Sequence, residues 1–323
     1  MPTIAPIDIQ SHCLLAGFLD DNPFFISADG VLHHLGEGEK QIEIGNGIAS
    51  AKIAENGRFV LTGGEDGRLC KVNADFSVIE LEKLGNKWLT AVANGPDDAY
   101  AYGTGRVAYG SVQGKSQEMP HERSIEDLAF APKGLRLALA HYNGVTLHWL
   151  GTESKPVSLE WKGAHTMVNF SPDGRFLVTA MQENALHGWR LADNQHLRMS
   201  GYPAKVKSWS WSSKGRYLAT SGAPAAVVWP FLGKDGPMGK APLELGTRAN
   251  ILVTCVACHP TEEMVAIGYE DGMVLFVRFA DQKEALLRRP GQGAISSLAW
   301  DKRGERLAFG SEAGDCGIID ITG

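Results

Sequence analysis

The fold is decided by a unit whose clearest copy spans residues 166–189 and reads TMVNFSPDGRFLVTAMQENALHGW. The unit contains a partly alternating apolar strand, an Asp-Gly turn, a continuous apolar strand and a third strand that ends in tryptophan. Val168 and Phe170 share one face of the first strand, whereas Leu177 and Val178 are adjacent and therefore make the second strand apolar on both faces. Because such a strand must be covered on both sides, the unit needs neighbours of the same kind.

Seven further copies of this unit recur at intervals of about forty residues. Three clear copies span residues 124–149, 206–229 and 294–320, and four weaker ones span 13–35, 47–72, 88–111 and 254–279. Pairs such as Asn56-Gly57 and Asp173-Gly174 supply the positive φ that tight hairpin turns require. No segment has the sustained 3.6-residue period of a helical repeat, and a β-sandwich would not need eight copies of one unit. The pattern predicts an all-β chain.

At these residues the chain resembles the WD-repeat family over nearly its whole length. The resemblance rests on the Ser-Pro-Asp-Gly-Arg segment, the Asp-Gly pairs and the tryptophans at the ends of third strands. The Asp-Gly pairs are Asp29-Gly30, Asp66-Gly67 and Asp271-Gly272, and the tryptophans are Trp149, Trp189 and Trp229. Leu150, Arg190 and Pro230 follow these tryptophans where the family has its namesake Asp. The resemblance is therefore to a divergent, bacterial-type member.

The resemblance implies a single β-propeller domain over residues 1–323, built from four-stranded antiparallel blades. Eight sequence copies favour eight blades, with seven as the alternative if residues 13–45 pair irregularly. The last copy ends after its third strand, at about Gly317–Thr322. The family closes its ring with an N-terminal strand, so residues 1–12, and Thr3–Asp8 in particular, are expected to supply the fourth strand of the last blade.

The resemblance also implies a hydrogen-bonded cluster that holds one blade together. His165 matches the family's histidine before the first strand, and Thr179 and Trp189 are its expected partners. Asn184 stands where the family usually has Asp. We expect these four residues to form a structural cluster rather than a binding site.

Composition excludes several classes of partner. The 323 residues carry a net charge of −6, and the 31 lysines and arginines form no block. Nucleic acid and membrane surfaces are therefore not expected as partners. The N-terminus has no signal-peptide pattern, and no run approaches the roughly 18 apolar residues of a membrane helix. The five cysteines are an odd number, which fits free thiols in the cytoplasm. Nothing requires more than a monomer.

The motif Cys255-Val-Ala-Cys258-His259 has the form used for covalent haem attachment. In a strand, however, Cys255 and Cys258 point to opposite faces, which suits a structural interpretation better. The chain has no Gly-x-Ser-x-Gly elbow, no phosphate-binding glycine loop and no His-Glu-x-x-His motif. We therefore expect no cofactor, no metal and no catalytic residue.

The function that fits best is a non-catalytic scaffold that binds a partner protein, which the sequence does not identify, through a face lined by loops. The alternative is an enzyme or a metal-handling propeller with its site in the central channel. By the family's layout, the partner-binding face consists of second-to-third-strand loops and inter-blade loops. Exposed aromatic, arginine and neighbouring side chains there are the candidate contacts. They are Trp88, Arg106, His141, Tyr142, Met181, Lys205, Arg248 and Tyr269.

Overall fold

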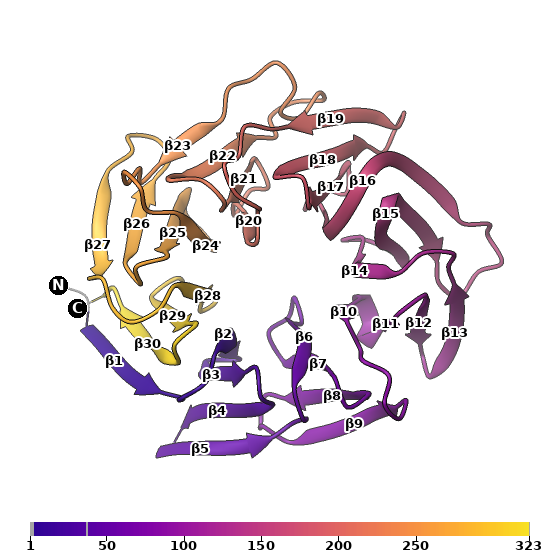
Figure 1. Ribbon diagram of the computed structural model, residues 1–323, viewed down its shortest axis with the longest axis horizontal. Helices are drawn as coiled ribbons and strands as arrows, with labels where there is room; N and C mark the ends of the chain where they lie inside the picture. Colours follow the sequence, from indigo (N-terminus) through magenta and orange to yellow (C-terminus); the bar gives the residue numbers. More distant parts are fainter. Residues whose placement is uncertain (1–2, 37, 323) are drawn as a thin grey trace. The chain divides into compact units, whose positions relative to one another are not determined.

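Antiparallel strands make up almost the whole chain in the computed structural model, which describes residues 3–36 and 38–322 (Figure 1). The chain divides into two compact units, the first made of Met1–Glu43 and Tyr202–Gly323 and the second of Ile44–Gly201. Within the described residues, no helix is long and apolar enough to cross a membrane.

The first unit contains four four-stranded sheets among its described residues. Their strand orders are β2-β3-β4-β5, β20-β21-β22-β23, β24-β25-β26-β27 and β1-β30-β29-β28. The strands are β1 (Thr3–Asp8), β2 (Cys13–Leu19), β3 (Asn22–Ser27), β4 (Val31–Gly36), β5 (Gly38–Glu43), β20 (Trp209–Trp211), β21 (Tyr217–Thr220), β22 (Ala226–Pro230), β23 (Leu243–Leu245), β24 (Val253–Cys258), β25 (Met264–Tyr269), β26 (Val274–Arg278), β27 (Glu284–Arg288), β28 (Ile295–Trp300), β29 (Arg306–Ser311) and β30 (Asp315–Asp320).

The second unit contains two four-stranded sheets, β6-β7-β8-β9 and β10-β11-β12-β13, and one six-stranded sheet, β14-β15-β16-β17-β18-β19. A short 3-10 helix, η1 (Pro96–Asp98), precedes β11. The strands are β6 (Ile48–Ile53), β7 (Phe59–Gly64), β8 (Arg68–Asn73), β9 (Val78–Lys83), β10 (Ala91–Asn94), β11 (Tyr100–Thr104), β12 (Val107–Val112), β13 (Lys115–Pro120), β14 (Ile125–Phe130), β15 (Arg136–Trp149), β16 (Val157–Phe170), β17 (Phe176–Met181), β18 (Ala185–Arg190) and β19 (Gln195–Met199).

The six-stranded sheet corrects the predicted number of blades. Counted as hydrogen-bonded sheets, the described strands form seven blades, so the prediction of eight is wrong. The sequence copies at 124–149 and 166–189 were expected to make separate blades. Both lie in this one sheet, because the 14-residue strand β16 pairs with β15 of the first copy and continues into the second copy, where it pairs with β17. Asn143-Gly144, a pair of residues common in turns, lies within β15.

The predicted closing strand is confirmed. β1 pairs antiparallel with β30 in continuous register, from Thr3 opposite Asp320 to Asp8 opposite Asp315. Figure 1 shows this N-terminal strand beside the last strand of the chain. The final sheet therefore takes one strand from the start of the chain and three from its end.

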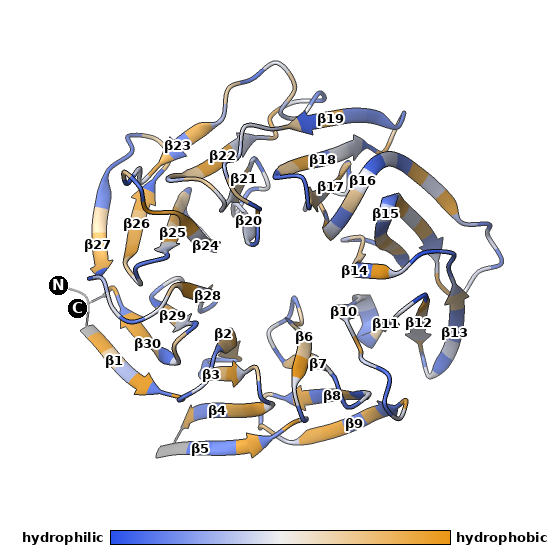
Figure 2. Cartoon of the chain, viewed as in Figure 1, coloured by the Kyte–Doolittle hydropathy of each residue, from blue (hydrophilic) through white to orange (hydrophobic). Residues whose placement is uncertain are grey.

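Strands in the interior of a sheet are buried most completely. All six residues of β7 and all six of β17 are buried, which agrees with the continuous apolar runs of the sequence. The edge strands β9 and β19 are mainly exposed. Figure 2 shows the same gradient, with β26 almost entirely hydrophobic and β19 mostly hydrophilic. Apolar burial between sheets therefore provides most of the stabilisation.

Several side-chain oxygens accept hydrogen bonds from backbone N–H groups of strands that are not their ladder neighbours. Three of these bonds join different sheets, whereas the bond between Asp127 and Val168 joins β14 to β16 within the six-stranded sheet. The pairs are Ser50 Oγ with Val92 N (3.3 Å), Asp127 Oδ2 with Val168 N (2.9 Å), Ser208 Oγ with Val256 N (3.1 Å) and Ser297 Oγ with Ala16 N (2.8 Å). These bonds satisfy buried N–H groups that no strand ladder reaches.

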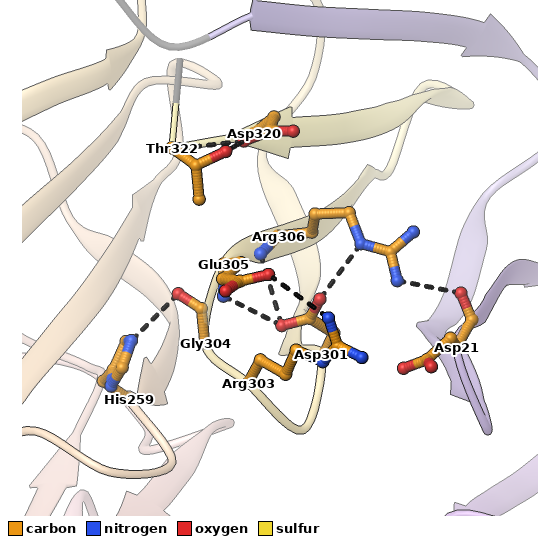
Figure 3. A network of polar contacts seen from close by, with 9 residues as sticks. All are labelled: Asp21, His259, Asp301, Arg303, Gly304, Glu305, Arg306, Asp320 and Thr322. Atoms are coloured by element: carbon orange, nitrogen blue, oxygen red, sulfur yellow. Dashed lines mark hydrogen bonds and ion pairs between the residues drawn. The ribbon is translucent and has the colours of Figure 1, made fainter.

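A polar network joins three sheets of the first unit through the turn after β28 (Figure 3). Asp301 is almost fully buried and accepts hydrogen bonds from the backbone N–H of Glu305 (2.9 Å) and from Arg306 Nε (3.0 Å). Arg306 also donates to the Asp21 carbonyl (2.9 Å) in the turn before β3. On the other side, His259 Nε2 donates to the Gly304 carbonyl (2.9 Å). The network therefore holds this turn to the sheets on both sides.

Candidate functional site

A cleft of about 850 Å³ lies within the second unit, over the middle of the six-stranded sheet. Its walls come from the connection between β13 and β14, from β15 and β16, and from β19. The side chains that matter most below are His121, Arg123, His141, Tyr142, Trp161 and Lys162. These residues are distant in sequence, and the sheet brings them together.

The cleft opens where the β15–β16 ladder is interrupted. Tyr142 lies opposite Ala164 and Gly144 lies opposite Glu160, so residues 161–163 of β16 face the single residue Asn143. Gly144 has a φ of 143°, and a Cβ there would collide with the Leu159 carbonyl, so only glycine fits. Asn143 Oδ1 accepts a hydrogen bond from Gly163 N (3.2 Å) and replaces part of the lost ladder. The interruption leaves Tyr142 52% exposed.

A closed ring of hydrogen bonds holds one wall of the cleft. His141 Nδ1 donates to the Tyr142 carbonyl (2.9 Å), which leaves His141 Nε2 to accept from the Thr146 hydroxyl (3.0 Å). Thr146 Oγ1 in turn accepts from His121 Nε2 (3.1 Å), and His121 Nδ1 accepts from Arg123 N (3.1 Å). Arg123 Nη1 closes the ring by donating to the Tyr142 carbonyl (2.6 Å). Every donor in the ring has an acceptor only while both imidazoles are neutral.

Burial keeps one of these imidazoles neutral. It lowers the pKa of His141 to about 4, and the nearby His121 and Arg123 act in the same direction. His141 Nε2 therefore keeps the hydrogen bond that it accepts from Thr146 at neutral pH. Arg123 also lies over the Tyr142 ring, with 5.9 Å from its guanidinium carbon to the ring centre. An arginine and an exposed tyrosine are thus held side by side at the cleft wall.

The opposite wall is formed by Trp161, which stacks on His187 with 3.9 Å between ring centres and an interplanar angle of 10°. His187 Nε2 and His196 Nδ1 share a hydrogen bond of 3.0 Å. Burial, followed by the neighbouring His196, lowers the pKa of His187 to about 3. Trp161 therefore rests on a neutral imidazole and is fixed in orientation.

The predicted blade cluster lies directly behind this wall. His165 Nε2 donates to the Trp161 carbonyl (2.9 Å), so His165 Nδ1 accepts from the Thr179 hydroxyl (2.7 Å). The rings of His165 and Trp189 have centres 5.7 Å apart. Burial lowers the pKa of His165 and keeps this tautomer neutral. Asn184 lies in the turn before β18, with a φ of 52°.

Only two of the eight predicted contact residues, His141 and Tyr142, line this cleft. Trp88, which is 56% exposed, and Arg106 are also on the surface of the second unit but outside the lining. Met181 is buried. In the first unit, Lys205 lines a smaller pocket of about 400 Å³, and Arg248 pairs with Glu284 (2.6 Å between Nη2 and Oε2).

Tyr269 requires a correction, because the structure places it in the core and not on a binding face. Its ring is fully buried among the apolar residues around β25 and β26. Its hydroxyl donates to the Gly246 carbonyl, and burial raises the pKa of the phenol. The residue stands at the end of β25, and the sequence pattern alone gave no sign that its side chain turns inward.

The sequence argument missed His121, Arg123, Thr146, Trp161 and Lys162. His121 and Arg123 belong to an inter-blade loop, which is the class of loop that the resemblance pointed to. The convergence of His121 with Thr146 depends on the pairing of β15 and could not be found from spacing. The adjacent Trp161-Lys162 pair, just before the predicted cluster histidine, was the available signal.

The cysteine motif belongs to the core, in agreement with the structural interpretation. Cys255 lies in the apolar cluster shared with β28, whereas Cys258 packs against the different cluster around β25. Burial raises the pKa of Cys255 to about 11 and that of Cys258 to about 12, so both thiols stay protonated. Within residues 3–36 and 38–322, no group of three or more His, Cys, Asp or Glu side chains is placed to hold a metal ion.

Comparison with known proteins agrees with this architecture. Residues 255–323 match the family model described as the anaphase-promoting complex subunit 4 WD40 domain. The crystal structure of the C-terminal WD40 domain of Sif2 is similar, with a TM-score of 0.77, 13% identity and coverage of 100% of this chain and 99% of that one.

A second similar structure is the computationally designed Ika8 protein, with a TM-score of 0.76, 16% identity and coverage of 97% and 98% of the two chains. No protein with curated annotation matches the chain in sequence. At these identities the similar structures show the fold alone. The repeats, the sheet topology and these matches together identify the fold as a β-propeller that is similar to solved WD40 domains, and the WD40 family model matches its last part.

Proposed function

We propose that this chain is a non-catalytic scaffold and that the cleft over the six-stranded sheet binds a segment of a partner protein. One observation carries the proposal: the closed ring of hydrogen bonds that presents Arg123 and Tyr142 together at the cleft wall. Arginine and tyrosine are frequent anchors of protein interfaces. Because the ring fixes them beforehand, little conformational entropy is lost when a partner binds.

The charges of the cleft favour a polar partner segment that carries both signs. Arg123 and Lys162 face the same space as Glu122 and Glu160. The aromatic faces of Tyr142 and Trp161 add apolar contact area between these charges. The WD40 fold is typically used as a protein-binding scaffold, which supports the same proposal at the level of the fold.

Affinity capture of the tagged full-length chain, followed by mass spectrometry, tests the proposal. Tyr142→Ala and Arg123→Ala are each expected to weaken partner binding by about tenfold or more, as truncation of a binding anchor does. Lys133→Ala, an exposed residue outside the cleft, is the matched control and should leave binding unchanged. Arg106→Ala tests whether the partner binds instead to the loop face that the sequence predicted, because Arg106 lies outside the cleft.

Two results would contradict the proposal. Partners recovered equally well with Tyr142→Ala and Arg123→Ala would exclude the cleft as the binding site. A stoichiometric metal in the purified protein, together with the absence of any recovered partner, would favour the enzyme or metal-handling alternative instead.

A further inference from the structure

Two of the five cysteines meet in the core of the first unit. Cys13 opens β2 and Cys316 lies in β30, and both side chains are fully buried in one hydrophobic cluster. A single Cβ built at Gly310 would contact the sulfur atoms of both residues, so the two thiols lie close together. All five cysteines of the chain are free thiols in this structure. The fold therefore places two thiols from opposite ends of the chain side by side.

A glycine makes room for the two sulfur atoms. Gly310 of β29 lies opposite Cys316 in the sheet. A Cβ at this position would lie only 2.6 Å from Cys13 Cβ and 3.4 Å from Cys316 Sγ, and it would collide with Cys13 Sγ. Any side chain at residue 310 would therefore push the two thiols apart.

The closing strand covers this pair. Ile7 of β1 lies opposite Cys316, and both Ile7 and the following Ile9 pack against the cluster that holds the two cysteines. β1 is an outer strand whose residues 4–6 and 8 are exposed. Outer strands held by one ladder open more readily than buried ones. Detachment of β1 would remove the cover of the thiols without unfolding β2 or β30.

We propose that Cys13 and Cys316 form a redox modification site, in which a small-molecule disulfide such as oxidised glutathione converts the thiol pair into a disulfide between β2 and β30. One cysteine, as its thiolate, attacks a sulfur of oxidised glutathione and releases one glutathione thiolate. The second cysteine then attacks the mixed disulfide, forms the Cys13–Cys316 bond and releases the second glutathione. The two cysteines are oxidised, and the two protons they lose end on the two glutathione molecules.

The closed structure protects the pair. Hydrogen bonding to Cys316 and burial raise the pKa of Cys13 well above its usual range, so the thiolate needed for attack is scarce while β1 is in place. Oxidation therefore proceeds from the state in which β1 has detached. The new bond then holds β2 to the last strand of the chain, in parallel with the hydrogen bonds of β1, and constrains the unfolded chain through a very long loop.

The test uses the full-length chain incubated with oxidised glutathione. The expected product is ~2 mass units lighter because two hydrogens are lost, and a non-reducing peptide map should link the peptides of Cys13 and Cys316. Ile7→Ala should accelerate the reaction by about tenfold, because it weakens the attachment of β1. Ile4→Ala, an exposed position on the same strand, is the matched control and should react at the wild-type rate.

The oxidised chain should also unfold at a higher urea concentration than the reduced chain, and Cys13→Ala and Cys316→Ala should each abolish this difference. Cys70→Ala, which removes a buried thiol in the second unit, should not abolish it. A stable glutathione adduct without the internal link, a link from Cys13 to Cys255, or no link in either wild type or Ile7→Ala would overturn the proposal. These mass measurements are made on wild type and Ile7→Ala, so they stand even if a cysteine variant does not fold.

Discussion

At the scale of single residues, the buried imidazoles make stability depend on pH. The pKa of His141 is about 4 and that of His187 about 3, against about 6.5 for histidine in an unfolded chain. Between these values the unfolded chain binds protons that the folded chain does not, so the free energy of unfolding falls as the pH falls. The contribution is complete above about pH 6.5 and is lost progressively as the pH falls, down to about pH 4 for His141 and about pH 3 for His187.

Urea unfolding at several pH values measures this linkage. His141→Gln removes one titrating group and should flatten the loss of stability between pH 6.5 and pH 4, whatever stability the variant has at neutral pH. Ser154→Ala, a change at an exposed position without a titrating group, is the control and should keep the wild-type slope. The same slope in His141→Gln and wild type would show that His141 does not stay neutral in the folded chain.

At the scale of elements, β1 illustrates how a strand can protect a sheet edge. Its six residues pair with the whole of β30, so its removal would leave the backbone groups of β30 unpaired. We expect a chain that begins at Ser11 to melt at a lower temperature and to aggregate, because an exposed edge pairs with other chains. A chain that begins at Thr3 is the control. Calorimetry measures the melting temperature of both chains, and light scattering measures their aggregation. A chain beginning at Ser11 that stays monomeric with an unchanged melting temperature would refute the prediction.

The elements also show where prediction from sequence succeeds. The strand Thr3–Asp8 was predictable because the last copy ends after its third strand, and the missing fourth strand can be recognised from the sequence alone. The number of blades was not predictable in the same way. Asn143-Gly144 has the composition of a turn, yet both residues take positive φ inside the continuous strand β15. Whether such a pair ends a strand depends on the partner strand, which the pair itself does not encode.

At the scale of the whole molecule, the repeat predicted the architecture better than the site. The strands of each copy can be predicted from that copy alone, because apolar alternation and turn residues are patterns that extend over only a few positions. The cleft depends instead on contacts such as that between His121, in the loop between two copies, and Thr146, which lies 25 residues further along the chain. The prediction that Tyr269 lies on a binding face was wrong for the same reason. The acceptor of its hydroxyl hydrogen bond is the carbonyl of Gly246, which belongs to another loop.

The repeated sheets also predict how stability is distributed through the molecule. β7 and β17 are fully buried, whereas the edge strands β9, β13 and β19 are mostly exposed and bonded on one side only. Local opening should therefore begin at these edge strands. Hydrogen exchange followed by mass spectrometry should show rapid exchange in peptides from β9, β13 and β19 and strong protection in those from β7 and β17. Equal protection of all five strands would mean that a sheet opens only as a whole, and β1 could not then detach separately to expose Cys13 and Cys316.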